Sequence, residues 1–505
     1  MVMGSPEVRI PLTPFDHCVP RAYYNGAIYL SIRPGVTFTE AFAVLHEALH
    51  RTFVTVPWLS GKVHLQSSDS PGWRPGQGEI RYCPVDVNDP WPHQFKFKEL
   101  ESSVSFDEIK DAGFPTDTFN DDDLVWSPFF ADLSSTPEVF VGQANFIPGC
   151  CIITAAIHHS ASDETAFFHV LKLWSGNCNA LQRESKRLAE MSVGSSDRSV
   201  PDRLWTRERT GENVDEIDPQ TWMLIGISPS DIHQEPVKAS TSAAAHAPPP
   251  KSTLRAQQLL KAGIFYVSPS GLSALQRDIA QELGGSGGIS SNDAVCALIW
   301  RCFLRARSMA RKASGNSSEE SGEADAVLNM VCDGRPNFST GLPPKYLGNI
   351  TFNVLSKLPL PSLTSTDTSI ATVAATIRRG ASSIGSAHLM DLYTLLQNLS
   401  GFDDLARWKR NRTSSIEGNN MAISSMIMFP VSDVNFGDRI FGNRGMVEAI
   451  RPFMDGLNRF TRICFVLPRN KNGSVEFVAN LFDEEMDILM EDEEFANYAT
   501  CLSWA

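Results

Sequence analysis

The cysteines of this chain show no spacing typical of a metal site. The chain has ten of them, scattered along its length, with neither a C-x-x-C nor a cysteine–histidine cluster at metal-ligand spacing. We therefore expect no metal ion. Residues 1–19 also lack the basic segment and apolar core that mark a secretory signal, which favours reduced thiols and a cytoplasmic protein.

Long apolar runs and an excess of basic charge are missing as well. No window reaches the roughly 18 apolar residues that a membrane-spanning helix needs, so we expect no membrane insertion. The net charge of −14 argues against nucleic acid as a partner, because binding phosphates requires a basic face. An anionic cofactor would have to be bound by a local basic patch rather than by the overall charge.

The length predicts more than one domain. A chain of 505 residues is too long for one compact core, so two domains of about 200 to 250 residues are expected. Both halves mix strand-like and helix-like patterns, and a polar, aperiodic stretch that ends in three prolines separates them. We predict an α/β fold with an N-terminal domain (1–191), a crossover linker (192–252) and a C-terminal domain (253–505).

Hydrophobic periodicity predicts the elements of the first half. Residues 42–53 have apolar side chains at helical spacing. Residues 139–147 and 151–157 are typical of two strands joined as a hairpin, and a helix over 165–174 follows.

The second half is predicted to alternate strands and helices, ending in an acidic helix after Asp483. The glycine-rich stretch 284–288 follows a helix and lacks the Lys-Ser/Thr of a phosphate-binding loop, so we interpret it as a flexible turn. The acidic, low-complexity segment 314–325 is predicted to be disordered. The expected strands are 264–267, 327–332, 351–355, 463–467 and 475–481, and the expected helices are 269–283 and 294–311, the second capped within Ser291-Asn292-Asp293.

The strongest chemical signal is the stretch Ile157-His158-His159-Ser160-Ala161-Ser162-Asp163, at the exit of a predicted strand. A histidine there is suited to take a proton from a hydroxyl or an amine near neutral pH. Taken alone, H-x-x-x-D is short enough to recur by chance, and two structural histidines at a strand end are the commoner explanation. Asp163 taken alone is also explained as an ordinary helix N-cap.

The stretch resembles the H-x-x-x-D motif of the BAHD acyltransferases, within the chloramphenicol-acetyltransferase-like superfamily. The resemblance is closest to their fungal relatives, which include the trichothecene O-acetyltransferases. Other landmarks of the family occur in the family's order along both halves. These are Pro57-Trp58-Leu59-Ser60-Gly61-Lys62, the helix Ser291 to Arg301 (SNDAVCALIWR), Asp333-Gly334-Arg335-Pro336, Tyr346-Leu347-Gly348-Asn349, Leu467-Pro468-Arg469 and Val475-Glu476-Phe477.

Three stretches depart from the family pattern. The D-F-G-W-G signature is half present as Asn435-Phe436-Gly437-Asp438-Arg439, which puts in doubt the geometry of the CoA-side loop but not the chemistry. Glu164 follows the aspartate where plant members have glycine. Met426 replaces the tryptophan of the family's T-S-W stretch.

The resemblance implies two chloramphenicol-acetyltransferase-like domains, with mixed sheets flanked by helices and an active-site channel at their interface. His159 is implied as the general base and Asp163 as a structural residue paired with Arg335. Ser424 aligns with a threonine proposed as the oxyanion donor, and a plain strand hydroxyl is an equal alternative.

The phosphates of CoA require cations, and the densest positive run lies on the helix that carries Arg301 and Arg305, with Lys345 beyond it. We name these three as candidate cofactor-binding residues; a solvated helix face is the alternative. The implied function is a monomeric acyl-CoA-dependent O-acyltransferase. Its donor would be acetyl-CoA and its acceptor a hydroxyl of a terpenoid, polyketide or alkaloid.

Three other functions remain open. Condensation domains of peptide synthetases use the same motif with donors bound to carrier proteins, and the lack of a fused carrier domain argues against that use here. An isomerase or cyclase could use His159 without an acyl donor. A non-catalytic binding protein is disfavoured by the intact His159 and Asp163. Acylation of an amine instead of a hydroxyl is also possible with the same base, His159.

Overall fold

The computed structural model describes residues 6–209, 213–232, 259–285, 288–314, 325–409, 416, 418–459 and 461–504. Most of the predicted acidic segment (315–324), the proline-rich end of the predicted linker and two residues of the glycine-rich turn (286–287) lie outside the described residues. Gly284 and Gly285 have φ of 63° and 77°, which fits the predicted turn. None of the described helices is long and apolar enough to cross a membrane.

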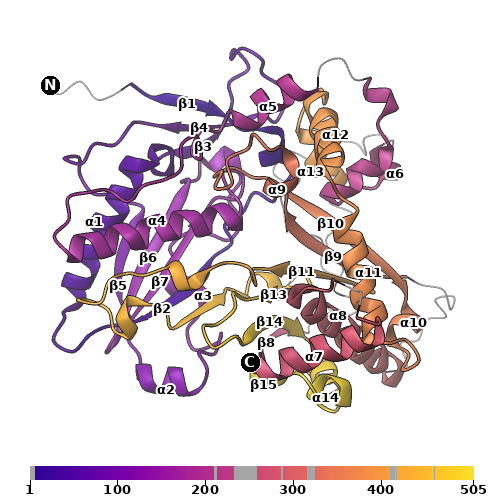
Figure 1. Ribbon diagram of the computed structural model, residues 1–505. Helices are drawn as coiled ribbons and strands as arrows, with labels where there is room; N and C mark the ends of the chain where they lie inside the picture. Colours follow the sequence, from indigo (N-terminus) through magenta and orange to yellow (C-terminus); the bar gives the residue numbers. More distant parts are fainter. Residues whose placement is uncertain are drawn as a thin grey trace.

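The first half is built on a five-stranded mixed sheet in the order β12-β2-β7-β6-β5 (Figure 1). The predicted hairpin is β6 and β7, joined through Gly149, whose φ of 81° lies in the left-handed region that favours glycine. The strands are β2 (Gly26–Ser31), β5 (Phe95–Glu99), β6 (Phe140–Ile147), β7 (Cys150–Ile157) and β12 (Ala449–Pro452). A small sheet beside it has the order β1-β4-β3, with β1 (Val8–Pro11), β3 (Lys62–Leu65) and β4 (Gly78–Tyr82).

Helices cover both faces of the five-stranded sheet, which explains why every residue of β6 and β7 is buried. On one face Ile153 packs with residues of α1 (Phe38–Thr55) and α4 (Glu164–Gln182). On the other face Ile152 packs with residues of α2 (Phe106–Asp111) and α3 (Asp121–Leu124). A strand buried on both faces is a near-continuous apolar run, as the sequence 150–157 is.

The second half is built on a seven-stranded mixed sheet in the order β10-β9-β11-β13-β14-β8-β15. Its largest core lies between the sheet and the helices that cover one face, with Trp300 of α8 fully buried. The strands are β8 (Lys261–Val267), β9 (Asp325–Asp333), β10 (Thr351–Pro359), β11 (Asn420–Ser425), β13 (Ile463–Val466), β14 (Val475–Leu481) and β15 (Thr500–Trp504). The helices are α7 (Pro269–Glu282), α8 (Ser291–Ala313), α9 (Arg335–Phe338), α10 (Leu360–Thr364), α11 (Ile370–Ser382), α12 (Ser386–Gln397), α13 (Asp403–Lys409), α14 (Asp483–Met490) and α15 (Glu493–Ala496).

The other face of this sheet lies against the first half. Ile264, Phe465 and Val478 form an apolar cluster there, against which Tyr24 and Phe129 of the first half pack. The two sheets therefore meet through side chains rather than across a bare linker. The predicted α/β fold with mixed sheets flanked by helices is confirmed.

Two segments cross the predicted domain division. β12 of the second half pairs with β2, and Val434, Phe436 and Phe441 belong to the core of the first half. Figure 1 shows this late, gold-coloured stretch running back over the first sheet. Within the predicted linker, α5 (Val200–Glu208), η5 (Pro219–Ile225) and α6 (Pro229–Ile232) follow one another, and residues of the first two enter the core of the second sheet. The limits of the two domains stay a prediction.

Two local predictions need correction. The N-cap of α8 is Ser290, not a residue of 291–293, because its Oγ accepts from the amide of Asp293 while the Asp293 carboxylate accepts from Ser290. The chain also does not end in the acidic helix: β15 follows it and pairs with β8.

Candidate active site

The loop that carries the two histidines lies between β7 and α4. Its backbone is fixed on both sides, because the amide of His158 donates to the carbonyl of Val139 at 2.8 Å and the amide of His159 donates to that of Ala22 at 2.9 Å. Successive side chains at the end of a strand point to opposite faces, so the two imidazoles enter different surroundings.

The ring of His159 is held by one nitrogen. Its Nδ1 lies 3.0 Å from the carbonyl oxygen of Ser162, and since a carbonyl only accepts, Nδ1 carries the proton and Nε2 keeps its lone pair. The ring of Tyr24 meets it edge to face, with centroids 5.0 Å apart. Burial lowers the pKa of His159, against the opposing effects of the Asp163 charge and the Ser162 carbonyl. The imidazole is therefore neutral at pH 7 and has the form that a general base requires.

His158 is fully buried and both of its ring nitrogens are engaged. Its Nε2 donates to the carbonyl of Ala131 at 2.7 Å, and its Nδ1 accepts from the amide of Ser160 at 3.3 Å. Burial lowers its pKa to about 4. This ring is a structural group, which agrees with the choice of His159 as the candidate base.

Asp163 and Arg335 form a buried ion pair between the two halves. Nη2 of Arg335 donates to both carboxylate oxygens of Asp163, at 2.8 and 3.0 Å. Asp163 also accepts from the amide of Ala166, as the N-cap of α4, and from that of Ile350. The contact expected from the resemblance is therefore present, and the N-cap alternative holds at the same time.

The guanidinium of Arg335 has partners on every side. Nη1 donates to Asp333 at 2.7 Å, Nε to the carbonyl of Tyr346 at 2.8 Å, and Nη2 also to that of Gly348 at 2.7 Å. Nearby negative charges, with Asp163 first, raise its pKa against the effect of burial. A pair so fully compensated anchors the end of the loop.

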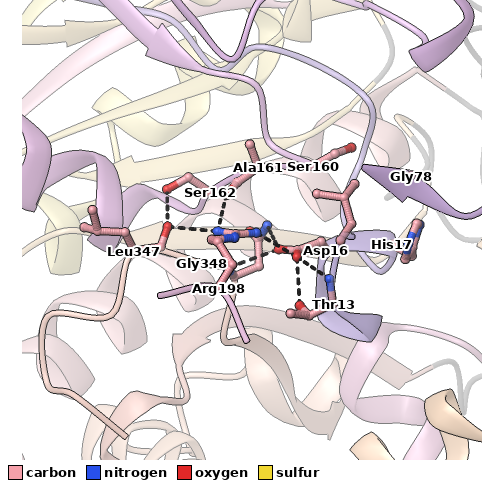
Figure 2. A network of polar contacts seen from close by, with 12 residues as sticks. Thr13, Asp16, His17, Gly78, Ser160, Ala161, Ser162, Arg198, Leu347 and Gly348 are labelled. Carbon is pink, nitrogen blue, oxygen red and sulfur yellow. Dashed lines mark hydrogen bonds and ion pairs between the residues drawn. The ribbon is translucent and has the colours of Figure 1, made fainter. Parts of the chain in front are cut away.

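A second buried ion pair, between Asp16 and Arg198, was missed by the sequence analysis (Figure 2). Arg198 Nη2 donates to Asp16 at 2.7 Å, and its Nη1 donates to the carbonyls of Ala161 and Leu347. Because Ala161 lies inside the His159–Asp163 loop, this pair holds the middle of that loop.

Asn349 joins the second ion pair to the candidate base. Its Nδ2 donates to Asp16 and to the backbone carbonyl of His159, both at 2.8 Å. Asn349 belongs to the Y-x-G-N landmark, which could have pointed to this role. For Asp16 and Arg198 no sequence signal was available, since the partners are 182 residues apart.

The structure places Ser424 on β11, where its hydroxyl donates to Oε2 of Glu164 at 2.9 Å. This bond crosses from the second sheet to the first residue of α4. Burial raises the pKa of Glu164, the Asp163 charge adds to the rise, and the Ser424 bond opposes it. The predicted oxyanion donor therefore has a carboxyl partner that the sequence analysis did not assign.

Arg301 and Arg305 are engaged inside the second half. Arg301 forms an ion pair with Glu494 at 2.8 Å, and Arg305 pairs with Asp492 and Glu494, both at 2.7 Å. The acidic C-terminal segment that packs on α8 neutralises these guanidinium groups. Arg301 is buried rather than on a solvated helix face, and the assignment of the two arginines to cofactor phosphates stays a prediction.

Lys345 is exposed, unlike the two arginines. Burial lowers the pKa of His169 on α4 to about 4, and the positive charges of Arg335, Lys345 and Lys172 contribute to that shift. Lys345 thus lies in a locally positive region beside the helix that follows the His159 loop, and it stays a candidate for a phosphate contact.

One group of potential metal ligands occurs among the described residues, formed by Cys302, Asp492 and Glu494 within 4.8 Å of one another. Both carboxylates are already paired with the arginines of α8. We interpret the group as part of that ion-pair network.

Two family models match the chain. The Transferase family model matches residues 135–496, and the "Trichothecene 3-O-acetyltransferase-like N-terminal domain" model matches residues 28–178. The first match spans more than half of the chain and includes both the His159 loop and Ser424.

Curated relatives match almost the whole chain. The "Isocyanide synthase-NRPS hybrid crmA" of Aspergillus fumigatus is 31% identical over 97% of this chain, which spans only 31% of that protein. "Acyltransferase BOA11" of Botryotinia fuckeliana is 26% identical, with 99% of each chain covered.

Among solved structures, that of Fusarium graminearum TRI101 complexed with ethyl coenzyme A is similar with a TM-score of 0.71. The match covers 99% of this chain and 100% of that one, at 19% identity. The fold predicted from the resemblance is therefore shared with an established member of this structural class.

Proposed function

The chain belongs to the Transferase family of acyltransferases, and from this premise we propose that it is an acyl-CoA-dependent O-acyltransferase. The proposed donor is acetyl-CoA, and the proposed acceptor is a hydroxyl of a secondary metabolite such as a terpenoid, polyketide or alkaloid. The observation that carries the proposal is the neutral imidazole of His159, fixed through Nδ1 with Nε2 left as a proton acceptor. We also propose that the enzyme is cytoplasmic and monomeric.

In the proposed reaction, Nε2 of His159 takes the proton of the acceptor hydroxyl as its oxygen attacks the thioester carbonyl. The carbonyl oxygen becomes an oxyanion, which the hydroxyl of Ser424 is proposed to stabilise. The tetrahedral intermediate then collapses, the carbon–sulfur bond breaks, and the imidazolium returns its proton to the leaving thiolate. The products are the acyl ester and free CoA, and His159 is neutral again.

Asp163 takes no part in these proton transfers in our proposal. Its carboxylate is directed to Arg335, and the Nδ1 proton of His159 goes to a backbone carbonyl instead. The two buried ion pairs fix the loop so that Nε2 stays in one position before substrate arrives, which reduces the entropy cost of the attack.

Donor and acceptor classes are supported by what the matches are named for. One family model is named for trichothecene 3-O-acetyltransferases, and the TRI101 structure holds ethyl coenzyme A. For this chain, we propose that Lys345, which is exposed and lies near the helix that follows the loop, contacts the anionic part of the donor.

The test is thiol release from acetyl-CoA by the purified full chain in the presence of a panel of alcohols. We expect alcohol-dependent release that is lost in His159→Ala and kept in His93→Ala, an exposed histidine paired with Glu138. Release that survives His159→Ala undiminished would overturn the general-base proposal.

A second candidate function is acyl transfer from a donor bound to a carrier protein. It is favoured by the match to a segment of an NRPS hybrid over 97% of this chain. The same assay separates the two: an acylated carrier protein that serves as donor where acetyl-CoA does not would select the second function.

A further inference from the structure

Glu164 occupies a position that the proposed mechanism does not use. It is the first residue of α4, directly after Asp163, where plant members of the family have glycine. Its carboxyl is partly buried, and burial raises its pKa, in contrast to ordinary glutamates at a helix start, which face water.

The carboxyl of Glu164 faces groups from three separate elements. Ser424 on β11 donates to it at 2.9 Å, and Asp163 lies beside it at the start of the same helix. Tyr24, from the segment before β2, has its pKa raised by burial and by the charge of Glu164. Since the Tyr24 ring also contacts His159, the carboxyl lies at the edge of the candidate site.

We propose that Glu164 is a positioning residue: by holding or releasing the hydroxyl of Ser424 across the interface of the two sheets, it determines whether that hydroxyl donates to the oxyanion. This inference rests on the proposed acyl transfer. It adds a residue that the pattern of the plant members does not contain.

The argument follows from what each form of a carboxyl does in a hydrogen bond. An ionised carboxylate only accepts, so it keeps the single proton of the Ser424 hydroxyl. A protonated carboxyl donates to the serine oxygen, and the serine proton is then free to point at the thioester. An ionised Glu164 would also repel the developing oxyanion in a poorly hydrated site. On both counts the neutral carboxyl is the competent form.

The sign of the pH effect is fixed by this assignment. His159 must be neutral, so turnover rises as pH increases through its pKa, which burial lowers. Glu164 must be protonated, so turnover falls as pH increases through its pKa, which burial raises. The Asp163 charge raises both pKa values, and the Ser424 bond lowers that of Glu164 alone. The rate profile of the wild type should therefore be bell-shaped, with Glu164 responsible for its alkaline side.

Glu164→Gln tests the proposal because its amide is able to donate to the serine oxygen and never ionises. The variant should lose the alkaline fall in kcat while keeping the acid side and the KM of the acceptor. Ser424→Ala should lower kcat by on the order of 100-fold, as removal of an oxyanion donor does. In the Ser424→Ala background, Glu164→Gln should have no further effect, because the hydroxyl on which it acts is gone.

Glu190→Gln is the matched control, since this glutamate is exposed and pairs with Arg187 on the surface. His159-dependent thiol release with an unchanged alkaline side in Glu164→Gln would overturn this inference and leave the proposed function in place. So would an effect of Glu164→Gln that persists without the Ser424 hydroxyl. No thiol release by the wild type from any CoA or carrier donor would overturn the proposed function and, with it, the inference.

Discussion

The two ends of the loop from His159 to Asp163 differ in how their polar atoms are paired. At Asp163 both carboxylate oxygens accept from Arg335, and the guanidinium has further acceptors in Asp333 and two backbone carbonyls. At His159, Nδ1 is bonded to the carbonyl of Ser162, and the chemistry of the ring leaves Nε2 able to accept a proton. The Asp163 end is fixed by its partners, whereas the His159 end keeps a nitrogen that can accept a proton from a substrate.

The difference indicates that the two ends of this five-residue loop have separate roles. Asp163 and Arg335, whose side-chain nitrogen and oxygen atoms are all hydrogen-bonded, contribute to stability and set the position of the loop. Nε2 of His159, which can still accept a proton, contributes to the rate. Substitutions at the two ends should therefore have different effects. A substitution of His159 should lower turnover and leave the melting temperature unchanged, whereas a substitution of Asp163 should lower both.

The largest effect is expected at the reactive end. His159→Ala should lower turnover by about 100- to 10,000-fold, the usual contribution of a general base. The melting temperature should stay that of the wild type, because the ring is only partly buried at the end of a strand. Rates by thiol release and melts by circular dichroism measure the two quantities. A melting temperature that falls with the rate would remove the contrast between the ends.

The next largest effect is expected at Asp163. Asp163→Ala leaves Arg335 as a buried charge without its main partner, which should lower the free energy of unfolding by about 3–5 kcal/mol. Asp163→Asn keeps the shape and should fall between this variant and the wild type. Denaturant titration provides the measurement. If both variants abolish turnover and leave stability untouched, Asp163 is a proton relay rather than an anchor.

Asp16→Asn extends the comparison to the second ion pair. It should lower the free energy of unfolding by less than Asp163→Ala does, by about 1.5–3 kcal/mol. Asparagine keeps an acceptor for Arg198, which also retains its bonds to the carbonyls of Ala161 and Leu347. Turnover should fall in proportion to the loss of loop order, with kcat changed more than KM, because the ion pair positions the base rather than the substrate. A stability loss equal to that of Asp163→Ala would mean that the two anchors are energetically equivalent.

His158→Asn should have the smallest effect, about 1–2 kcal/mol of stability, with turnover changed far less than in His159→Ala. Burial lowers the pKa of His158 to about 4 from 6.5, so the unfolded chain binds a proton that the folded ring does not. The contribution of the neutral, buried His158 ring to the free energy of unfolding is fully present above pH 6.5 and is lost as pH falls toward 4. The stability gap between wild type and variant should therefore narrow on acidification, and a widening gap would contradict the assignment.

Much of the fold around the loop could be predicted from the sequence because its causes are local. The apolar runs of β6 and β7, the glycine between them and the aspartate before α4 each specify their own conformation. The choice of His159 over His158 follows from alternation along a strand. The contact between Asp163 and Arg335 came from the resemblance to a family alone, since no local rule joins residues 172 positions apart.

Contacts between distant segments could not be predicted from the sequence. Arg301 and Arg305 form the densest positive run in the sequence, yet Asp492 and Glu494, almost 200 residues later, pack against them and neutralise them. Asp16, Arg198 and the Glu164–Ser424 bond also depend on contacts between distant segments. Charge patterns along a chain do not reveal which charges the fold will bring together.

The pairing of β12 with β2 has a consequence for the order in which the protein is made. β2, β5, β6 and β7 have all been synthesised once residue 157 is added, but the strand that covers the free edge of β2 ends at Pro452. At about 5–20 residues per second, the missing strand arrives roughly 15 to 60 seconds later. During that interval the nascent sheet exposes unpaired backbone groups that favour association with other chains. Production of this protein should therefore depend on chaperones that shield an open strand edge, and on the speed of translation between residues 157 and 452.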